Sequence, residues 1–216
     1  MSQPPITFFL LSPANLGGRR AAIVMNEAAT FDVAARLHSP AGAPLADVFS
    51  FVSGLYFRGK AAYARAFGSA PDGASAALVI SPGEGLLVLD EPVTLDRLRG
   101  WASVPIDAGN RSFTEPLVRH AEDLERAYGA TARFVLLGSV ATDKYVRPLV
   151  RVFGDHLLFP SDFVGRGDMS RGALMLRAAR DGRELAYAPV EGSARRGPRA
   201  PSIATPARRA AAGPRS

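Results

Sequence analysis

Short apolar runs that alternate with helical stretches constrain the fold of this chain more than any other feature. The clearest runs are ITFFLL at Ile6–Leu11, AALVI at 76–80 and RFVLL at 133–137. Each ends at Ser-Pro or Gly-Ser, which is typical of buried strands that end in loops. The alternation predicts a three-layer Rossmann-like α/β fold, with helices on both faces of a parallel or mixed sheet.

The remaining elements follow from periodicity and from breaker residues. Further strands are expected at 21–25, 86–89, 156–159 and, as an edge strand, 184–190. Helices are expected at 31–37, 55–67, 95–101, 113–128, 140–153 and 168–180. Pro148 should kink or restart its helix, and Asp168 should cap the last one.

Charge and composition divide the chain into two parts. The net charge of +6 equals the six arginines that follow residue 192, where no acid occurs, so residues 1–192 are neutral. With 47% hydrophobic residues the chain can bury a full core, and 1–192 suffices for one domain. The Arg/Pro/Ala composition of 193–216 predicts a disordered tail. The tail is expected to contact nucleic acid at most nonspecifically.

Cysteine is absent, which excludes a disulfide framework and a thiol nucleophile. No apolar run is long enough to cross a membrane and no secretory leader is evident, so we expect a cytoplasmic protein without a membrane partner. The three histidines are scattered, which predicts no metal site, and no motif indicates a cofactor. The oligomeric state stays open.

The loop after the first strand is a candidate for binding an anion. It holds two glycines for close backbone approach and the polar residues Ser12, Asn15, Arg19 and Arg20. It matches neither a Walker loop nor G-x-G-x-x-G. A polar turn with solvated arginines is the alternative.

The loop after the strand at 76–80 places an acid between glycines, in Ser81, Gly83, Glu84 and Gly85. Glu84 is a candidate general base, because closure of a pocket over it would desolvate the carboxylate and raise its pKa. Alternatively, Glu84 faces water from an ordinary turn.

Two further loops complete the candidate site. Gly138, Ser139, Thr142 and Lys144 surround an expected helix start, where free N–H groups favour an anion, although capping alone explains such residues. The segment 159–171 gathers Asp162, Arg166, Asp168 and Arg171, which would clamp one another or a ligand, with Asp168 a second acid/base candidate.

Lys60 lies on the apolar side of the expected helix at 55–67, with Tyr56 and Tyr63, whereas Arg58 and Arg65 point the opposite way. Its ammonium must extend outward to water or reach a buried anion. The outward arrangement is the commoner one and is expected, with Lys60 kept as a candidate ligand contact.

Three segments carry a resemblance to known proteins. They are the strand with Ser-Pro at 10–13, LYFRGKAAYA at 55–64 and VISPGEGL at 79–86, followed in similar order by 104–106 and 134–145. Together they resemble uncharacterised bacterial proteins and, distantly, the glycosylase-like domain of archaeosine synthase and related nucleobase-modification families. This chain has Gly83-Glu84 where some of those relatives carry a Lys-His pair.

The resemblance implies an α/β fold similar to that of uracil-DNA glycosylases. It also implies a protein that handles a nucleoside, nucleotide or nucleobase, through base modification or N-glycosidic bond chemistry. A small nucleoside or nucleotide, or weakly bound nucleic acid, is the expected partner. The other hypothesis is a non-catalytic ligand-binding or regulatory module that uses the same loops. Convergence of the loops on one edge of the sheet would support a shared site.

Overall fold

A computed structural model describes residues 5–129 and 131–198 of the chain. Its centre is a six-stranded mixed sheet in the order β4-β3-β1-β6-β7-β8, flanked by helices, so the expected three-layer α/β fold is confirmed. The four inner strands are parallel, namely β1 (Ile6–Leu11), β3 (Ala77–Ser81), β6 (Ala132–Leu137) and β7 (Leu157–Pro160). The antiparallel edge strands are β4 (Gly85–Val88) and β8 (Tyr187–Pro189).

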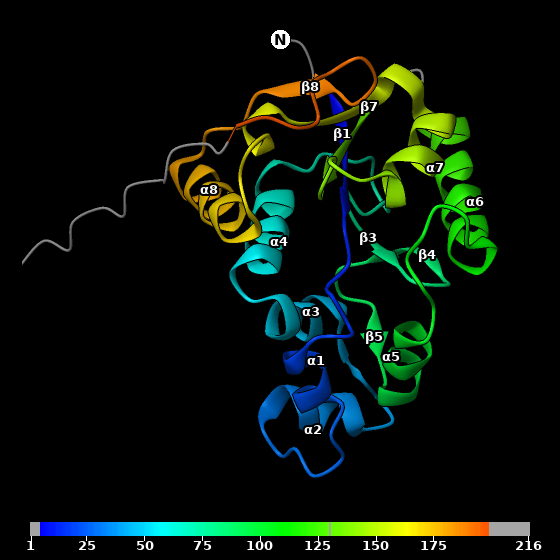
Figure 1. Cartoon of the computed structure of the whole chain (residues 1–216), viewed down its shortest axis with the longest axis vertical. Coiled ribbons are helices and arrows are strands. Elements are labelled where there is room, and N and C mark those ends of the chain that lie inside the picture. Colours follow the sequence, from blue (N-terminus) through cyan, green and yellow to red (C-terminus); the bar gives the residue numbers. More distant parts are fainter. Residues whose placement is uncertain (1–4, 130, 199–216) are drawn as a thin grey trace, which may run out of the picture.

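Alternate residues of β1 divide the core into two layers. Phe9 and Leu11 pack towards α4 (Leu55–Phe67) and α8 (Asp168–Asp181), whereas Phe8 and Leu10 pack towards the other face. That second face is covered by α6 (Arg111–Tyr128) and α7 (Asp143–Phe153), and Figure 1 shows the two pairs of helices on opposite sides of β1. Strands buried on both faces require continuous apolar runs, which is the pattern of ITFFLL.

The smaller elements extend the layer that carries α4. They are α1 (Arg19–Val24), α2 (Asp32–His38), α3 (Leu45–Ser53), α5 (Leu95–Ala102) and a two-stranded sheet of β2 (Ala43–Pro44) with β5 (Pro92–Val93). In Figure 1 they lie below the carboxyl end of β1. Two short 3-10 turns, Gly154–His156 and Ser161–Phe163, flank β7.

The strand expected at 21–25 is wrong, because the segment belongs to α1. Its buried side chains are Ala21 and Val24, and this spacing of three residues buries one face of a helix. Helix α3 begins directly after Pro44, in a segment for which no element was expected.

Helix starts differ in detail from the expectations. Asp168 is the first residue of α8 and Gly167 is its N-cap, so the expected capping by Asp168 is wrong. Helix α7 begins at Asp143, three residues later than expected, and Pro148 lies inside it without ending it.

Helices α4 and α8 approach each other through glycines. A Cβ on Gly59 would lie 2.6 Å from the carbonyl oxygen of Gly172, and a Cβ on Gly172 would lie 2.7 Å from the carbonyl oxygen of Leu55. Only hydrogen at both positions permits this backbone contact. The close packing brings the first turn of α8 against the first turns of α4.

The loops that follow the parallel strands all lie at the carboxyl ends of those strands. Between β1 and β6 the connections run to opposite sides of the sheet. From β1 the chain crosses over to β3 on one side, and after β3 it returns to β6 on the other side of β1. Ligands in open α/β sheets bind at such a switch point. The four candidate loops follow β1, β3, β6 and β7, so all four leave the sheet at the carboxyl ends of its parallel strands.

The described start of the expected tail contacts the domain. Arg195 pairs with Asp143 at 3.0 Å, and Arg196 donates to the carbonyl oxygen of Ala141 at 3.0 Å. Residues 199–216, on which most of the tail prediction falls, lie outside the described residues. Across 5–129 and 131–198 no helix has the length and apolar character that a membrane crossing requires.

Candidate functional site

The site begins with a lysine whose ammonium reaches the end of β1. Lys60 projects from α4, is 1% exposed, and donates from Nζ to both the Ser12 carbonyl oxygen, at 2.9 Å, and Ser12 Oγ, at 2.7 Å. Ser12 directly follows β1 and is 3% exposed. The expected outward arrangement of Lys60 is therefore wrong, because a buried oxygen pair at the switch point satisfies the amine.

Burial lowers the pKa of Lys60 to about 7. The main cause is desolvation, which penalises the charged ammonium. The negative charge of Asp168 opposes this shift, and the positive charge of Arg171 adds to it. A substantial share of free amine is therefore present near neutral pH.

Two tyrosines border the pair. Lys60 Nζ lies 4.0 Å from the centre of the Tyr56 ring, and the Tyr56 hydroxyl is buried without a hydrogen bond of good geometry to any described residue. Burial raises the pKa of both phenols, Tyr56 and Tyr145. For Tyr145 a hydrogen bond with the Ser12 side chain opposes that increase, and for Tyr56 the charge of Arg171 does so. Both phenols therefore stay protonated at neutral pH.

Gly138 directly follows β6 and lies beside Ser12. A Cβ at this position would lie 2.8 Å from Ser12 Cβ and 3.0 Å from Ser12 Oγ. Any larger residue than glycine would therefore crowd the Ser12 side chain. The following backbone N–H groups, of Ser139, Val140 and Ala141, donate to no described residue. Unpaired N–H groups beside a hydroxyl can stabilise a negatively charged oxygen.

Arg171 closes the site from α8. It is 8% exposed, its Nε and Nη2 donate to the Phe163 carbonyl oxygen at 3.2 and 3.1 Å, and its Nη1 lies 3.7 Å from Asp168 Oδ1. The Asp168 side chain is mostly exposed. Arg166 donates to the Asp162 carbonyl oxygen at 2.9 Å, which orders the loop that leads into α8.

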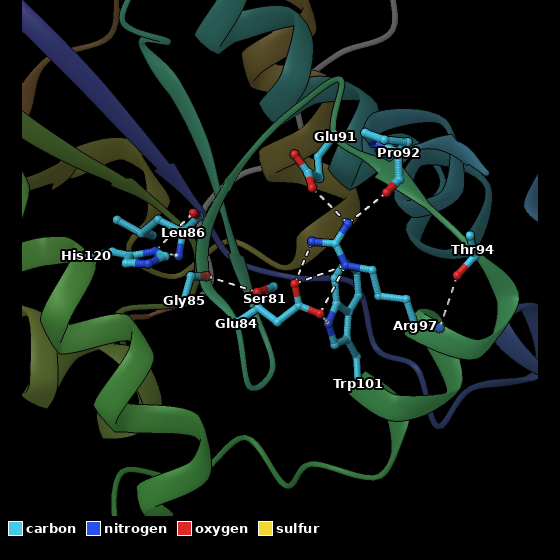
Figure 2. Close-up of polar contacts among 10 residues, drawn as sticks. All are labelled: Ser81, Glu84, Gly85, Leu86, Glu91, Pro92, Thr94, Arg97, Trp101 and His120. Atoms are coloured by element: carbon cyan, nitrogen blue, oxygen red, sulfur yellow. Dashed lines mark hydrogen bonds and ion pairs between the residues drawn. The ribbon is translucent and has the colours of Figure 1, made fainter. Parts of the chain in front are cut away.

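Glu84 lies in the turn between β3 and β4, where its partners are Arg97 and Trp101 (Figure 2). Arg97 donates to both of its carboxylate oxygens, and Trp101 Nε1 donates to Oε1 at 2.8 Å. These hydrogen bonds, with that from Arg97 the strongest, lower the pKa of Glu84, the opposite of the increase expected for a general base. Among the contacts described, none joins Glu84 to Ser12 or Lys60.

The glycines of that turn serve its geometry. Gly83 and Gly85 have φ values of +85° and +78°, in the left-handed region that favours glycine, and Ser81 Oγ donates to the Gly85 carbonyl oxygen at 3.1 Å. His120 of α6 accepts the Leu86 N–H at Nδ1 over 3.1 Å (Figure 2). The turn is thus fixed by its own residues and by α6.

The other candidates lie around the rim. The Asn15 side chain accepts the Gly17 N–H at 3.1 Å, Arg19 and Arg20 are exposed in the first turn of α1, and Lys144 is exposed in α7. Thr142 occupies the N-cap position of α7 without a side-chain hydrogen bond. Throughout the described residues, no three His, Asp or Glu side chains are grouped closely enough to hold a metal ion.

The structure therefore brings Ser12, Lys60, Gly138 and Arg171 together and adds two residues that were not predicted as site residues, Tyr56 and Tyr145. Tyr56 could have been predicted, because it lies four residues before Lys60 and therefore on the same face of the helix. Comparisons of the chain with protein-family models, with curated proteins and with solved structures found no match.

Proposed function

We propose that the chain is an enzyme that acts on a small polar substrate, with Ser12 as nucleophile and Lys60 as its general base. The observation that carries the proposal is the 2.7 Å contact between Lys60 Nζ and Ser12 Oγ, enclosed at the switch point of the sheet. A serine hydroxyl is a weak nucleophile until an adjacent base takes its proton. Desolvation keeps part of the Lys60 population as the free amine that this role requires.

The reaction class is acyl transfer to the serine, followed by hydrolysis. Ser12 Oγ attacks a carbonyl carbon while its proton passes to Lys60 Nζ, and the carbonyl electron pair moves to the oxygen. Collapse of this intermediate breaks the bond to the leaving group, which takes the proton from Nζ. Water then repeats the sequence, releasing the acid and restoring the serine. The N–H groups of Ser139 and Val140 would stabilise the oxyanion.

The nucleoside or nucleotide class remains the first substrate class to test. Tyr56 and Tyr145 offer phenol rings and hydroxyls, and Arg171 offers a cation, which together suit a ring bearing polar or anionic groups. Esters of nucleosides and nucleotides fit the acyl chemistry. N-glycosidic cleavage would instead need an acid/base, and Asp168 is the carboxylate of this cluster.

A fluorophosphonate probe tests the proposal without knowledge of the substrate. The probe should form a covalent adduct on Ser12, located by peptide mass spectrometry, at a rate that rises with pH through about 7 as Lys60 loses its proton. Ser12→Ala and Lys60→Met should abolish labelling, and Ser139→Ala, which removes a serine of the neighbouring loop, should keep it. Labelling elsewhere, or none in the folded wild type, contradicts the proposal.

A non-catalytic binding module is the second candidate. It is favoured by the 3% exposure of Ser12 and by the bond of Lys60 to the Ser12 carbonyl oxygen, since both suit a residue that only fixes the loop. Titration calorimetry with nucleosides, nucleotides and short nucleic acids separates the two. Binding without labelling, without ester turnover and without base release favours the module.

A further inference from the structure

An open cavity lies on the side of α4 away from Lys60. Successive residues of a helix are about 100° apart, so Arg58 and Lys60, two positions apart, point in nearly opposite directions. Arg58 is exposed there and lines an open cavity of about 550 Å³ between α1, α2, α3 and the start of α4. That volume is in the range of small-molecule sites.

Positive charge is concentrated in this cavity. Its lining includes Arg20, Arg36, Arg58 and the acid Asp47, and Asp32 pairs with Arg36 from outside the lining, so three cations face two acids. Since residues 1–192 are neutral as a whole, three arginines in one cavity mark a local excess of positive charge. Such a concave patch attracts anions.

Two of the three guanidinium groups have free donors. Arg20 and Arg58 make no side-chain hydrogen bond or ion pair with a described residue. Arg36 is anchored by Asp47 at 2.9 Å and by Asp32 at 2.8 Å, yet its Nε is buried without a partner. Unused, forked N–H donors are the groups that bind phosphate in a bidentate manner.

The backbone makes room for these donors. Gly54 is the N-cap of α4 and has a φ of +60°, and a Cβ there would lie 2.6 Å from Arg20 Nη1. Glycine therefore permits both the turn and the approach of the Arg20 guanidinium, and Ser50 adds a hydroxyl to the same lining. Aliphatic and aromatic surface from Val33 and Phe51 completes the cavity.

We infer that this cavity is an anion site that takes the phosphate groups of a small phosphorylated molecule, separate from the Ser12 site. Pyrophosphate is the probe, measured by titration calorimetry at low and at physiological salt. Wild type should bind pyrophosphate more tightly than inorganic phosphate, and Arg20→Gln and Arg58→Gln should each weaken binding about tenfold, as expected for the loss of a charge-assisted hydrogen bond. The double variant should not bind.

Arg65→Gln is the matched control. Arg65 lies on the same helix two turns after Arg58, outside the cavity lining, so its loss changes the net charge equally. Binding by Arg65→Gln should stay within about twofold of wild type, and Ser12→Ala should bind normally, because the two sites are independent. Thermal melts verify that each variant is folded.

Three results would overturn the inference. They are no heat of binding with pyrophosphate, equal weakening by Arg65→Gln and Arg58→Gln, and binding of citrate as tight as that of pyrophosphate. The second would show a general effect of charge, and the third would remove the preference for phosphate. None of them bears on whether Ser12 is labelled.

Discussion

Lys60→Met should change how stability depends on pH, because the folded chain lowers the pKa of this lysine from 10.5 to about 7. Between these values the unfolded chain holds a proton that the folded chain has released, so wild-type stability rises with pH. Below about pH 7 both states are protonated, and the lysine contributes no slope. One pKa unit corresponds to about 1.4 kcal/mol, so the rise from pH 7 to pH 9 is about 2 kcal/mol.

Methionine fills a similar volume without a titrating group, and Asp168 and Arg171, the charges that act on Lys60, remain in the variant. The loss of the two hydrogen bonds from Lys60 to Ser12 lowers the stability of the variant by about 1–3 kcal/mol, and this loss does not depend on pH. Urea unfolding of both proteins from pH 6 to pH 9 isolates the pH-dependent part of the stability difference, because the titrations of all other groups are the same in both proteins and cancel. The stability of Lys60→Met relative to wild type should fall by about 2 kcal/mol from pH 7 to pH 9. A constant difference would refute the reasoning.

Three other substitutions test the packing and the roles of nearby residues. Gly59→Ala places a methyl group 2.6 Å from the Gly172 carbonyl oxygen and should lower the free energy of unfolding by about 1–3 kcal/mol in urea; no change would contradict the close contact of α4 and α8. Gly138→Ala should displace Ser12 and slow fluorophosphonate labelling about a hundredfold while the chain stays folded, and unchanged labelling would argue against a confined hydroxyl. Glu84→Gln should cost about 1 kcal/mol of stability, since the carboxylate is 37% exposed, and leave labelling within about twofold. A loss of two to four orders of magnitude in turnover would restore Glu84 as a general base.

The layers of the fold could be predicted because buried parallel strands require continuous apolar runs. Three of the four inner strands follow clear runs of this kind, and the amphipathic face of α4 was also evident. A short apolar segment such as 21–25 spans too few residues for its periodicity to distinguish a helix from a strand, and the strand predicted there was wrong. Helix α3 was missed because the prolines before it suggested a connection.

The chemistry of the site depends on contacts between residues that are far apart in the sequence, which local sequence patterns do not predict. Lys60 is 48 residues from Ser12 along the chain, and its burial follows from the approach of α8 through Gly59 and Gly172. For Glu84 the local turn was recognised, but its partners lie 13 and 17 residues further on, and they change the direction of its pKa shift. Pairings of this kind are decided by tertiary topology.

Helix α4 supplies both proposed sites, and its geometry keeps them apart. The face that carries Tyr56 and Lys60 is enclosed by β1 and α8, where desolvation suits proton transfer to a free amine. The face that carries Arg58 borders an open cavity, where a permanently charged guanidinium suits an anion in contact with water. Lysine on the enclosed face and arginine on the open face agree with these demands, because lysine loses its proton when buried and arginine does not. The residue types on the two faces are thus an argument, independent of the distances, for proton transfer at one site and charge recognition at the other.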